Sequence, residues 1–337
     1  MNTIGITMGC PAGIGPEIIL KFFADPTLSA SLQPVVLGDA AVLERCAAEL
    51  GIGCPPISDW QPGRPFTERT IPVLNLSQLP ETEFSWGHPT METGRAMAHY
   101  IETGVDLIQK NIIDGITTCP IAKTTLNSAG YDYPGHTEML AHLTGTRDVV
   151  MMMAGTRLKV TLVTIHCALK TVPAMITSEA VNSLIDVTSN SLVRDFGIPA
   201  PKIAVAGLNP HAGEDALFGR EERDIIRPAV EAAKRRTIDV SGPFPPDTVF
   251  YSAASGNYDA VVCMYHDQGL IPFKLLHFDD GVNVTLGLPI VRTSVDHGTA
   301  YDIAGKGVAS HLSLAAAVNL ADSICTNRKK FDSCPKQ

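Results

Sequence analysis

The chain has 337 residues, of which 45% are hydrophobic and 18% are charged, and its mean hydropathy is +0.12. This composition predicts a globular protein of one large or two modest lobes, and the net charge of -9 excludes a general nucleic-acid-binding role, which needs a basic face. The N-terminus lacks the pattern of a signal peptide and no apolar run approaches the roughly 20 residues that span a bilayer, so we expect a cytoplasmic protein.

Short apolar runs alternate along the chain with stretches whose apolar residues recur at helical spacing. The runs predict strands at residues 4–8, 34–37, 115–118, 149–153, 159–165, 202–206 and 260–264. The helical stretches are residues 16–23, 93–110, 178–194 and 220–235. This alternation predicts an α/β fold with a mostly parallel sheet, in which ligands bind beyond the carboxyl ends of the strands.

Two segments are expected to lie at the surface: the Pro- and Gly-rich residues 54–65, and the polar tail from Arg328 to Gln337, which we expect to fray. The eight cysteines form no CxxC pair, and Cys119, Cys167 and Cys263 lie in apolar runs. We therefore expect buried free thiols, as in a reducing cytosol, rather than a disulfide framework.

Three histidines each follow a predicted strand: His166, His211 and His266. If these strands are parallel, the three imidazoles emerge at one edge of the sheet. Three neutral imidazoles can hold a divalent cation and leave positions open for substrate. The alternative is that each histidine only bonds a backbone group at the end of its strand. Asp267 and Glu214 are candidates to orient the metal ligands, or ordinary loop carboxylates.

Two glycine-rich segments are candidates for cofactor binding. The first, Gly9-Cys10-Pro11-Ala12-Gly13-Ile14-Gly15-Pro16-Glu17, follows a strand and opens a helix, where free backbone N–H groups attract anions. Its spacing is not GxGxxG, and a tight structural turn explains it as well. The second, Asp296-His297-Gly298-Thr299-Ala300 with Asp302, has the small residues that admit an adenine and a ribose; a turn with a helix cap is the alternative.

Further polar residues are candidates for binding an anionic substrate. His136 and Thr137 lie where a helix is expected to begin, and the alternative for Thr137 is a plain N-cap. Lys274, Asn283 and Arg292 lie in residues 270–299, which we interpret as a run of Gly and Pro turns. Arginine and lysine suit phosphate or carboxylate, although each could equally be a solvated surface group.

In combination, five segments resemble the 4-hydroxythreonine-4-phosphate dehydrogenase family of pyridoxal phosphate biosynthesis. The resemblance runs from Gly5 to about Ala321. The segments are Gly13-Ile14-Gly15-Pro16-Glu17, Gly135-His136-Thr137-Glu138, Leu208-Asn209-Pro210-His211-Ala212-Gly213-Glu214, Tyr265-His266-Asp267-Gln268-Gly269 and Arg292-Thr293-Ser294-Val295-Asp296-His297-Gly298-Thr299-Ala300. Residues 297–307 also resemble the adenosine-binding turn of isopropylmalate dehydrogenases.

The resemblance implies a two-lobed α/β/α fold of the isocitrate/isopropylmalate dehydrogenase-like type, which binds NAD or NADP without a Rossmann fingerprint. The expected lobes are residues 1–128 with 285–330 on the cofactor side, and 129–284 for substrate, metal and dimerisation. The implied residues are His166, His211 and His266 for one divalent metal; His136, Thr137, Lys274, Asn283 and Arg292 for substrate; and Gly13, Gly15, Gly298, Thr299, Ala300 and Asp302 for cofactor.

The family further implies a homodimer with shared active sites, in which the partner subunit's His266 reaches the metal. The implied reaction is the metal-dependent oxidation of 4-phosphooxy-L-threonine by NAD(P)+, with decarboxylation to 3-amino-2-oxopropyl phosphate. Zinc, cobalt, manganese and magnesium all remain open as the metal. Asp247 is a candidate general base by position only, and a structural turn residue is the alternative. Cys10 departs from the family, which has an acidic residue there, so we assign this position no catalytic role.

Two rival interpretations remain. The first is a paralogous dehydrogenase for 4-phospho-D-threonate, 4-phospho-erythronate or a cis-dihydrodiol carboxylate. The second is a non-catalytic protein that keeps the metal and ligand sites; retention of both the three histidines and the cofactor turn argues against it.

Overall fold

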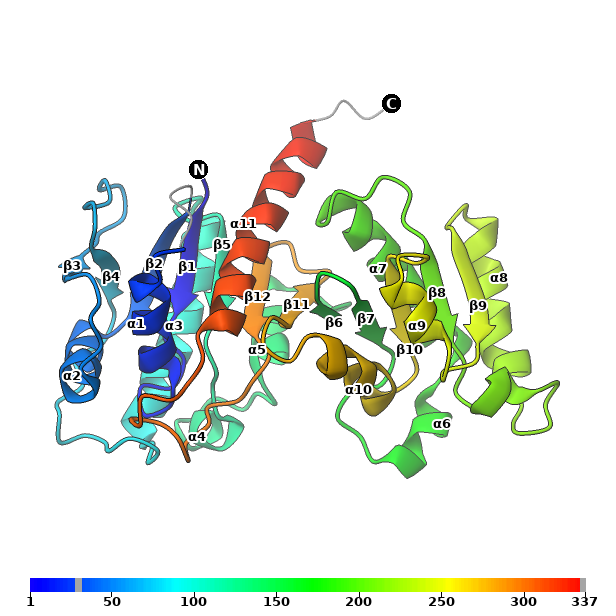
Figure 1. The fold of residues 1–337 in the computed structure, drawn as a ribbon, viewed down its shortest axis with the longest axis horizontal. Coiled ribbons are helices and arrows are strands. Elements are labelled where there is room, and N and C mark those ends of the chain that lie inside the picture. The colour runs from blue at the N-terminus through cyan, green and yellow to red at the C-terminus, as the bar shows by residue number, and fades with distance from the viewer. Residues whose placement is uncertain (28–31, 334–337) are drawn as a thin grey trace. The chain divides into compact units, whose positions relative to one another are not determined.

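The computed structural model describes residues 1–27 and 32–333, and the chain divides into two compact units. Unit 1 comprises Met1–Val149 with Leu288–Thr326, and unit 2 comprises Val150–Gly287 with Asn327–Gln337 (Figure 1). The first boundary lies later than the expected one after residue 128, because α5 (His136–Thr144) packs against α3 (Met91–Gln109) within unit 1.

Unit 1 contains six strands that pair in parallel in the order β3-β4-β2-β1-β5-β12. Nearly every residue of β1 and β2 is buried, which is typical of strands in a parallel sheet that helices cover on both faces. The elements besides α3 and α5 are β1 (Thr3–Thr7), α1 (Gly15–Ala24), β2 (Gln33–Gly38), α2 (Ala40–Leu50), β3 (Ile57–Asp59), β4 (Ile71–Asn75), β5 (Gly115–Thr118), α4 (Lys123–Ser128), β12 (Val291–Val295) and most of α11 (Leu312–Ser333).

Unit 2 contains six strands in the order β11-β6-β7-β10-β8-β9, of which β7, β10, β8 and β9 are parallel neighbours. The β11–β6 and β6–β7 pairs are antiparallel. The elements are β6 (Val150–Ala154), β7 (Lys159–Leu162), α6 (Val172–Met175), α7 (Ser178–Arg194), β8 (Ile203–Ala206), α8 (Arg227–Arg235), β9 (Val240–Phe244), α9 (Val249–Ala254), β10 (Ala260–Cys263), α10 (His266–Leu276) and β11 (Val282–Leu286), with a 3-10 turn at Leu169–Thr171 and a π-helical turn at Glu222–Ile226.

The core of unit 2 lies where helices α9 and α10 cover the parallel strands. It is built from side chains that are at most 9% exposed, among them Val160, Ala204 and Val261 from the strands and Phe250 and Phe273 from the helices. Burying each large apolar side chain stabilises the fold by about 2 kcal/mol. This packed layer fixes the carboxyl ends of β7, β10 and β8, from which the three histidine segments leave.

The predicted α/β class is confirmed, and every predicted strand overlaps an observed one. The interpretation of residues 270–299 as turns is wrong. Lys274 lies in the last turn of α10, Asn283 lies in β11 and Arg292 lies in β12. The glycines and prolines of this stretch punctuate two short strands whose residues are mostly β-branched, and the strands pair with β6 and β5.

The first expected surface segment is confirmed, since residues 61–65 are exposed, whereas the tail is more ordered than predicted. Residues 54–65 contain the edge strand β3, which pairs with β4. The first part of the tail continues helix α11 as far as Ser333, and the last four residues of the chain lie outside the described residues. The side chain of Arg328 is buried, because its guanidinium donates to both carboxylate oxygens of Asp195 at 2.7 and 3.1 Å.

Replacing Asp195 by asparagine should lower the free energy of unfolding by about 2 kcal/mol, because the buried Arg328 guanidinium loses its charged acceptor. Urea denaturation of the full chain measures this change. Asp186→Asn is the matched control, since it removes the acceptor of another arginine, Arg236, from an exposed ion pair and should cost less than about 0.5 kcal/mol. Equal losses for the two variants would show that burial of the Arg328 pair is unimportant.

Candidate functional site

The three histidine segments follow three neighbouring parallel strands of unit 2. Strand β10 pairs with β7 on one side and with β8 on the other, so their carboxyl ends meet at one edge of the sheet. His266 begins α10 directly after β10, and His166 lies four residues beyond the end of β7. The expected parallel arrangement of these strands is therefore confirmed.

The rings of His166 and His266 lie side by side, with centroids 5.7 Å apart and planes tilted by 44°. This separation allows both imidazoles to approach one cation at the roughly 2.1 Å typical of metal–nitrogen bonds. The two rings line an open pocket of about 420 Å³. Its other lining residues are Ile165, Cys167, Ala168, Leu169, Val172, Tyr265 and Asp267.

Carboxylates contact two of the three histidines. Nδ1 of His266 lies 2.7 Å from Oδ1 of Asp267, a hydrogen bond. Nδ1 of His211 lies 3.6 Å from Oε2 of Glu214, within ion-pair distance. A carboxylate at Nδ1 holds the proton there and leaves Nε2 as the nitrogen that can bind a metal. The donor set therefore fits a divalent cation, and Asp267 and Glu214 lie where residues that orient metal ligands are expected.

His211 is not brought together with the other two. Within residues 1–27 and 32–333, no group of three His, Cys, Asp or Glu side chains is placed to hold a metal ion. His211 lies five residues beyond the end of β8, in a loop of left-handed backbone, and its ring lies 5.9 Å from that of Phe218. The loop carries the imidazole away from the strand end, so the expectation of three imidazoles at the sheet edge of one chain is not met.

In unit 1, the start of α5 forms a candidate anion site. The helix begins at His136 after an extended Gly135, so the first backbone N–H groups have no partner within the helix. Nε2 of His136 is buried and neither donates nor accepts a hydrogen bond, although buried polar atoms nearly always have a partner. The backbone amides at the start of α5 and the unpaired imidazole of His136 could together bind a phosphate or carboxylate.

Electrostatics support this interpretation. Burial and the neighbouring Arg292 guanidinium lower the pKa of His136 well below its usual value, so its imidazole is neutral at pH 7. Arg292 is 3% exposed and donates from Nε and Nη2 to Oγ1 of Thr118 at 3.2 and 2.8 Å. Burial lowers the pKa of Arg292 to about 9, partly offset by Glu138, so the guanidinium stays charged at pH 7. A buried cation beside a helix N-terminus favours an anionic ligand.

Three other expected site residues lie in unit 2. Lys274 is half-buried, with Nζ 5.9 Å from the centre of the Phe278 ring. Asn283 has a buried Oδ1 without a hydrogen bond. Asp247 is exposed in the turn between β9 and α9, where it caps no helix. Like His136, Asn283 therefore has a buried polar atom without a hydrogen-bond partner. The structure adds no support for Asp247 as a general base.

The two glycine-rich segments of unit 1 contact each other. The N–H of Ile14 donates to the carbonyl of Thr299 at 3.2 Å. A Cβ at Gly13 would lie 3.1 Å from that same carbonyl, and one at Gly15 would clash with the carbonyl of Met8. Both glycines are therefore required by close backbone packing, which is the structural alternative for this loop. A Cβ at Gly298, by contrast, would meet open space.

Cys10, in the first of these segments, is fully buried and accepts a hydrogen bond from the Tyr301 hydroxyl at 3.3 Å. Burial raises the pKa of its thiol. The remaining cofactor candidates lie at the surface end of the turn: Ala300 adopts φ 43°, and Asp302 is exposed. All seven cysteines within the described ranges are free, although Cys167 is only partly buried, unlike Cys119 and Cys263.

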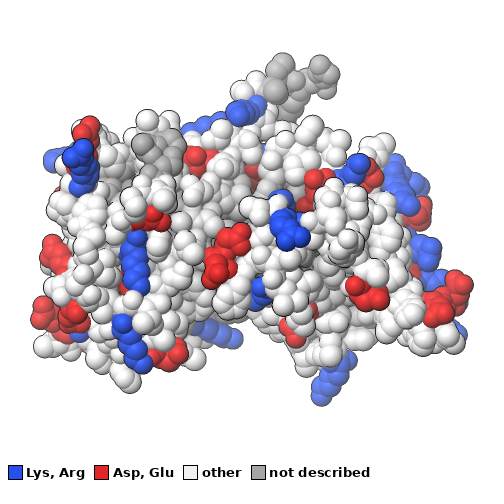
Figure 2. All heavy atoms as spheres, viewed as in Figure 1, with Lys and Arg blue, Asp and Glu red and all other residues white. Residues whose placement is uncertain are grey.

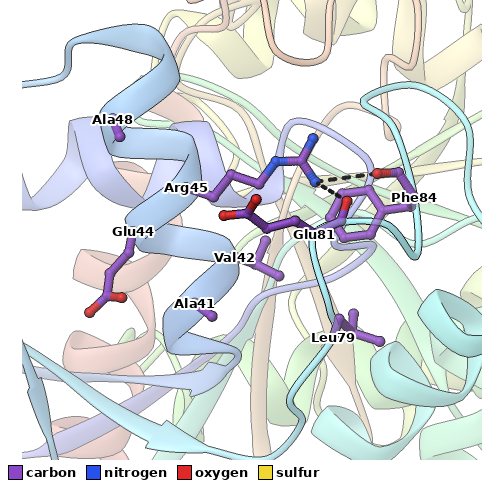
Figure 3. Close-up of a pocket in the computed structure, with 8 residues that line it drawn as sticks. All are labelled: Ala41, Val42, Glu44, Arg45, Ala48, Leu79, Glu81 and Phe84. Atoms are coloured by element: carbon purple, nitrogen blue, oxygen red, sulfur yellow. Dashed lines mark hydrogen bonds between the residues drawn. The ribbon is translucent and has the colours of Figure 1, made fainter.

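Another pocket, of about 300 Å³, lies in unit 1 between α2 and residues 79–84 (Figure 3). Arg45 reaches across it and donates to the carbonyls of Glu81 and Phe84 at 3.1 and 3.3 Å. Its guanidinium also lies over the rings of Phe84 and Trp86, at 5.2 and 5.0 Å. Since Arg45 already bonds to groups of the protein, we interpret this pocket as a packing contact between α2 and residues 79–84 and not as a ligand site.

Two findings bear on interactions with large partners. On the face shown in Figure 2, acidic and basic side chains are interspersed and form no continuous basic surface, in keeping with the net charge of -9. No helix among the described residues is long and apolar enough to cross a membrane.

Comparisons with known proteins agree with this arrangement. The family model described as "Pyridoxal phosphate biosynthetic protein PdxA" matches residues 30–321. A 4-hydroxythreonine-4-phosphate dehydrogenase of Desulforapulum autotrophicum is 54% identical over 322 residues, covering 94% of each chain. A D-threonate 4-phosphate dehydrogenase of Cupriavidus necator is 45% identical over 336 residues, covering 97% of this chain and 98% of the relative.

Among solved structures, the 4-hydroxythreonine-4-phosphate dehydrogenase of Klebsiella pneumoniae superimposes with a TM-score of 0.87 at 44% identity, covering 96% of this chain and 98% of the other. Both the sequence and the fold are thus shared with dehydrogenases over nearly the whole length. The chain belongs to the pyridoxal phosphate biosynthetic protein PdxA family of oxidoreductases.

Proposed function

We propose that this chain oxidises the secondary hydroxyl of 4-phosphooxy-L-threonine with NAD(P)+ and that the resulting β-keto acid loses carbon dioxide to give 3-amino-2-oxopropyl phosphate. The observation that carries the proposal is the name shared by the relatives at 54%, 53% and 51% identity, all 4-hydroxythreonine-4-phosphate dehydrogenases. Two features support it: imidazoles for a metal in unit 2, and the start of α5 beside the buried Arg292 guanidinium for an anion in unit 1.

The proposed metal ligands are His166, His211 and His266. A divalent metal bound there would supply Lewis-acid chemistry for both the oxidation and the decarboxylation. Imidazole nitrogens favour zinc or cobalt over magnesium, which prefers oxygen ligands. Asp267 holds the imidazole of His266 by its Nδ1 and so orients the opposite nitrogen toward the pocket.

The residues proposed for the substrate act by binding and orientation. His136, Thr137 and Arg292 would hold an anionic group of the substrate at the start of α5, which fixes the carbinol carbon for oxidation. His136 is neutral at pH 7, so it can donate one hydrogen bond without adding charge. Lys274 and Asn283 stay predicted substrate contacts, and Asp247 stays a predicted base on position alone.

We also propose a homodimer. The support lies in unit 2, which exposes many large apolar side chains, among them Leu169, which lines the pocket of His166 and His266. Of the large hydrophobic residues that are exposed within the described ranges, most fall between residues 169 and 278: Leu169, Met175, Leu217, Phe218, Tyr251, Ile271, Leu275, Leu276 and Phe278. An apolar surface of this kind is typical of an interface between subunits.

The relative named D-threonate 4-phosphate dehydrogenase favours a second candidate substrate, 4-phospho-D-threonate. Purified protein loaded separately with Zn²⁺, Co²⁺, Mn²⁺ or Mg²⁺ should be assayed for NAD(P)H formation with both phosphorylated acids and with a cis-dihydrodiol carboxylate. We expect the highest kcat/KM with 4-phosphooxy-L-threonine. A preference for the D-threonate would select the second candidate, and no turnover of any substrate would leave a non-catalytic binding protein.

The turn at Gly298 is proposed to bind the cofactor, and Gly298→Ala tests this. Because the added methyl meets open space, the free energy of unfolding should change by less than about 0.5 kcal/mol. A methyl in a cofactor contact should raise the KM for NAD(P)+ roughly tenfold and leave kcat nearly unchanged. Gly53→Ala is the matched control, since its methyl also meets open space, but outside the predicted site. An unchanged KM in Gly298→Ala would remove this turn from the cofactor site.

A further inference from the structure

The loop that carries His211 has an unusual backbone. Six consecutive residues, from His211 to Ala216, have φ between 41° and 82°, and only Gly213 among them is a glycine. Left-handed backbone is unfavourable for a residue with a side chain, because its Cβ lies too close to the following carbonyl oxygen. Such a run persists only when neighbouring groups hold it, and strain of this kind is concentrated at functional sites.

A buried carboxylate holds the start of this loop. Glu222 is 2% exposed, and its Oε1 accepts a hydrogen bond from the backbone N–H of Asn209 at 2.7 Å. Its Oε2 accepts a second hydrogen bond from Nδ2 of Asn209 at 3.0 Å. Both contacts are made two residues before His211, so Glu222 grips the chain at the point where the left-handed run begins.

The backbone of the loop packs closely against this carboxylate at two glycines. A Cβ at Gly207 would lie 3.0 Å from Oε1 of Glu222, and one at Gly213 would lie 2.7 Å from Oε2. The loop therefore wraps around Glu222 from both sides. Glu222 itself begins a π-helical turn ahead of α8, a departure from the α-helix that is frequent at functional sites.

A second side chain connects the loop to the segment of His266. Gln268 is 7% exposed, and its Nε2 donates to the carbonyl of Gly207 at 2.6 Å. Its Oε1 accepts a hydrogen bond from the N–H of Met264 at 2.6 Å. Through Gln268 and Glu222, the backbone on which His211 stands is tied to the end of strand β10, from which His266 projects.

From this geometry we infer that Glu222 is a positioning residue for His211: by holding Asn209 it fixes the strained loop, and with it the imidazole that the proposed function assigns to the metal. The inference rests on the proposed function, in which His211 binds the metal. Glu222 acts through the backbone and does not contact the cation. Without it, the loop relaxes toward ordinary backbone angles and His211 moves.

Co²⁺ binding to the full-length protein, measured by isothermal titration calorimetry, tests the inference. Glu222→Gln places an N–H group against a donor of Asn209, and should weaken Co²⁺ binding roughly 10- to 100-fold, the range found when groups that orient ligands are removed. Glu231→Gln is the matched control, because it removes a carboxylate that makes an exposed pair with Lys234. It should leave Co²⁺ affinity unchanged.

The double variant separates positioning from general destabilisation. If Glu222 acts only through His211, then adding Glu222→Gln to His211→Ala should weaken Co²⁺ binding no further. A further loss equal to that of Glu222→Gln alone would overturn the inference. If His211→Ala alone leaves Co²⁺ affinity unchanged, the metal assignment fails instead, and the two failures are thereby told apart.

Asn209→Ala provides a second route should Glu222→Gln fail to fold. It removes only the Nδ2 donor of a half-buried side chain and keeps the backbone bond to Glu222. Co²⁺ binding should weaken by a smaller factor, about 3- to 10-fold, because the loop loses only the hydrogen bonds from this Nδ2 to Glu221 and Glu222. Wild-type affinity in Asn209→Ala, together with a normal thermal unfolding curve, would count against the proposed grip on the loop.

Discussion

Replacing His211 or His266 by alanine is expected to lower kcat/KM of the metal-loaded protein about 1,000-fold, because a Lewis acid contributes several kcal/mol to such reactions. Co²⁺ binding should weaken in parallel, and both quantities are measured on the same preparations. His99→Ala, which removes an exposed imidazole from α3, should change neither. Full activity and normal Co²⁺ binding in His211→Ala would remove His211 from the metal site.

Mixtures of inactive variants show which chain supplies each ligand. If the partner's His266 completes the site, a refolded mixture of His211→Ala with His266→Ala forms heterodimers with one intact site. Half the dimers are then half active, which gives about a quarter of wild-type activity. A mixture of His166→Ala with His211→Ala should stay inactive, since those two ligands would come from the same chain.

The same mixtures test the arrangement seen in one chain, where the rings of His166 and His266 lie 5.7 Å apart and His211 stands away. If instead the partner supplies His211, the mixture of His166→Ala with His211→Ala becomes active and that of His166→Ala with His266→Ala does not. Absence of activity in every mixture, or a fully active monomer, would overturn the shared site.

The fold was predictable where apolar residues form long local patterns. Parallel strands such as β2 and β10 are short apolar runs because both of their faces are covered, and such runs are recognisable in a sequence that is 45% hydrophobic. Helix α7 begins at the predicted Ser178, where Oγ1 of Thr177 caps it by accepting from the N–H of Ala180 at 3.1 Å. Local chemistry decides these elements.

Strands β11 and β12 escaped prediction because each has only five residues between glycines and a proline. Turn residues dominate a short window, whereas the pairing that makes these segments strands involves partners more than 100 residues away in sequence. The buried pair of Arg328 and Asp195 has the same origin: a charged tail resembles a solvated one until its distant partner is known.

The candidate site divides in the same way. That the histidines follow neighbouring strands was predictable, because it needs only strand ends and a parallel sheet. The separate position of His211 was not, since it depends on a run of left-handed residues that no local pattern shows. Glu222 lies among charged residues at 220–224, a pattern typical of a solvated helix face. In the structure, however, it is buried, with only 2% of its surface exposed. For Gln268, the sequence offered one indication of a role at the site: it lies two residues after His266.

Arg292→Ala is expected to raise the KM for the phosphorylated substrate about 100-fold, since hydrogen bonds to charged groups contribute roughly 1.5–3 kcal/mol each. The KM for the dephosphorylated analogue should rise much less. Arg292→Lys keeps the charge but loses the planar guanidinium, so its KM for the phosphorylated substrate should lie between those of the wild type and Arg292→Ala. Arg236→Ala, which removes an exposed guanidinium paired with Asp186, is the control.

The same variant has a readout that needs no substrate. Two causes lower the pKa of His136: burial, which is the larger, and the nearby charge of Arg292. Removing the guanidinium should therefore raise the pKa of His136, while burial keeps it below its usual value. A histidine titration by NMR, with His136→Gln to assign the signal, measures this shift. An unchanged pKa of His136, together with equal KM increases for phosphorylated and dephosphorylated substrates, would show that Arg292 neither faces His136 nor binds the anion.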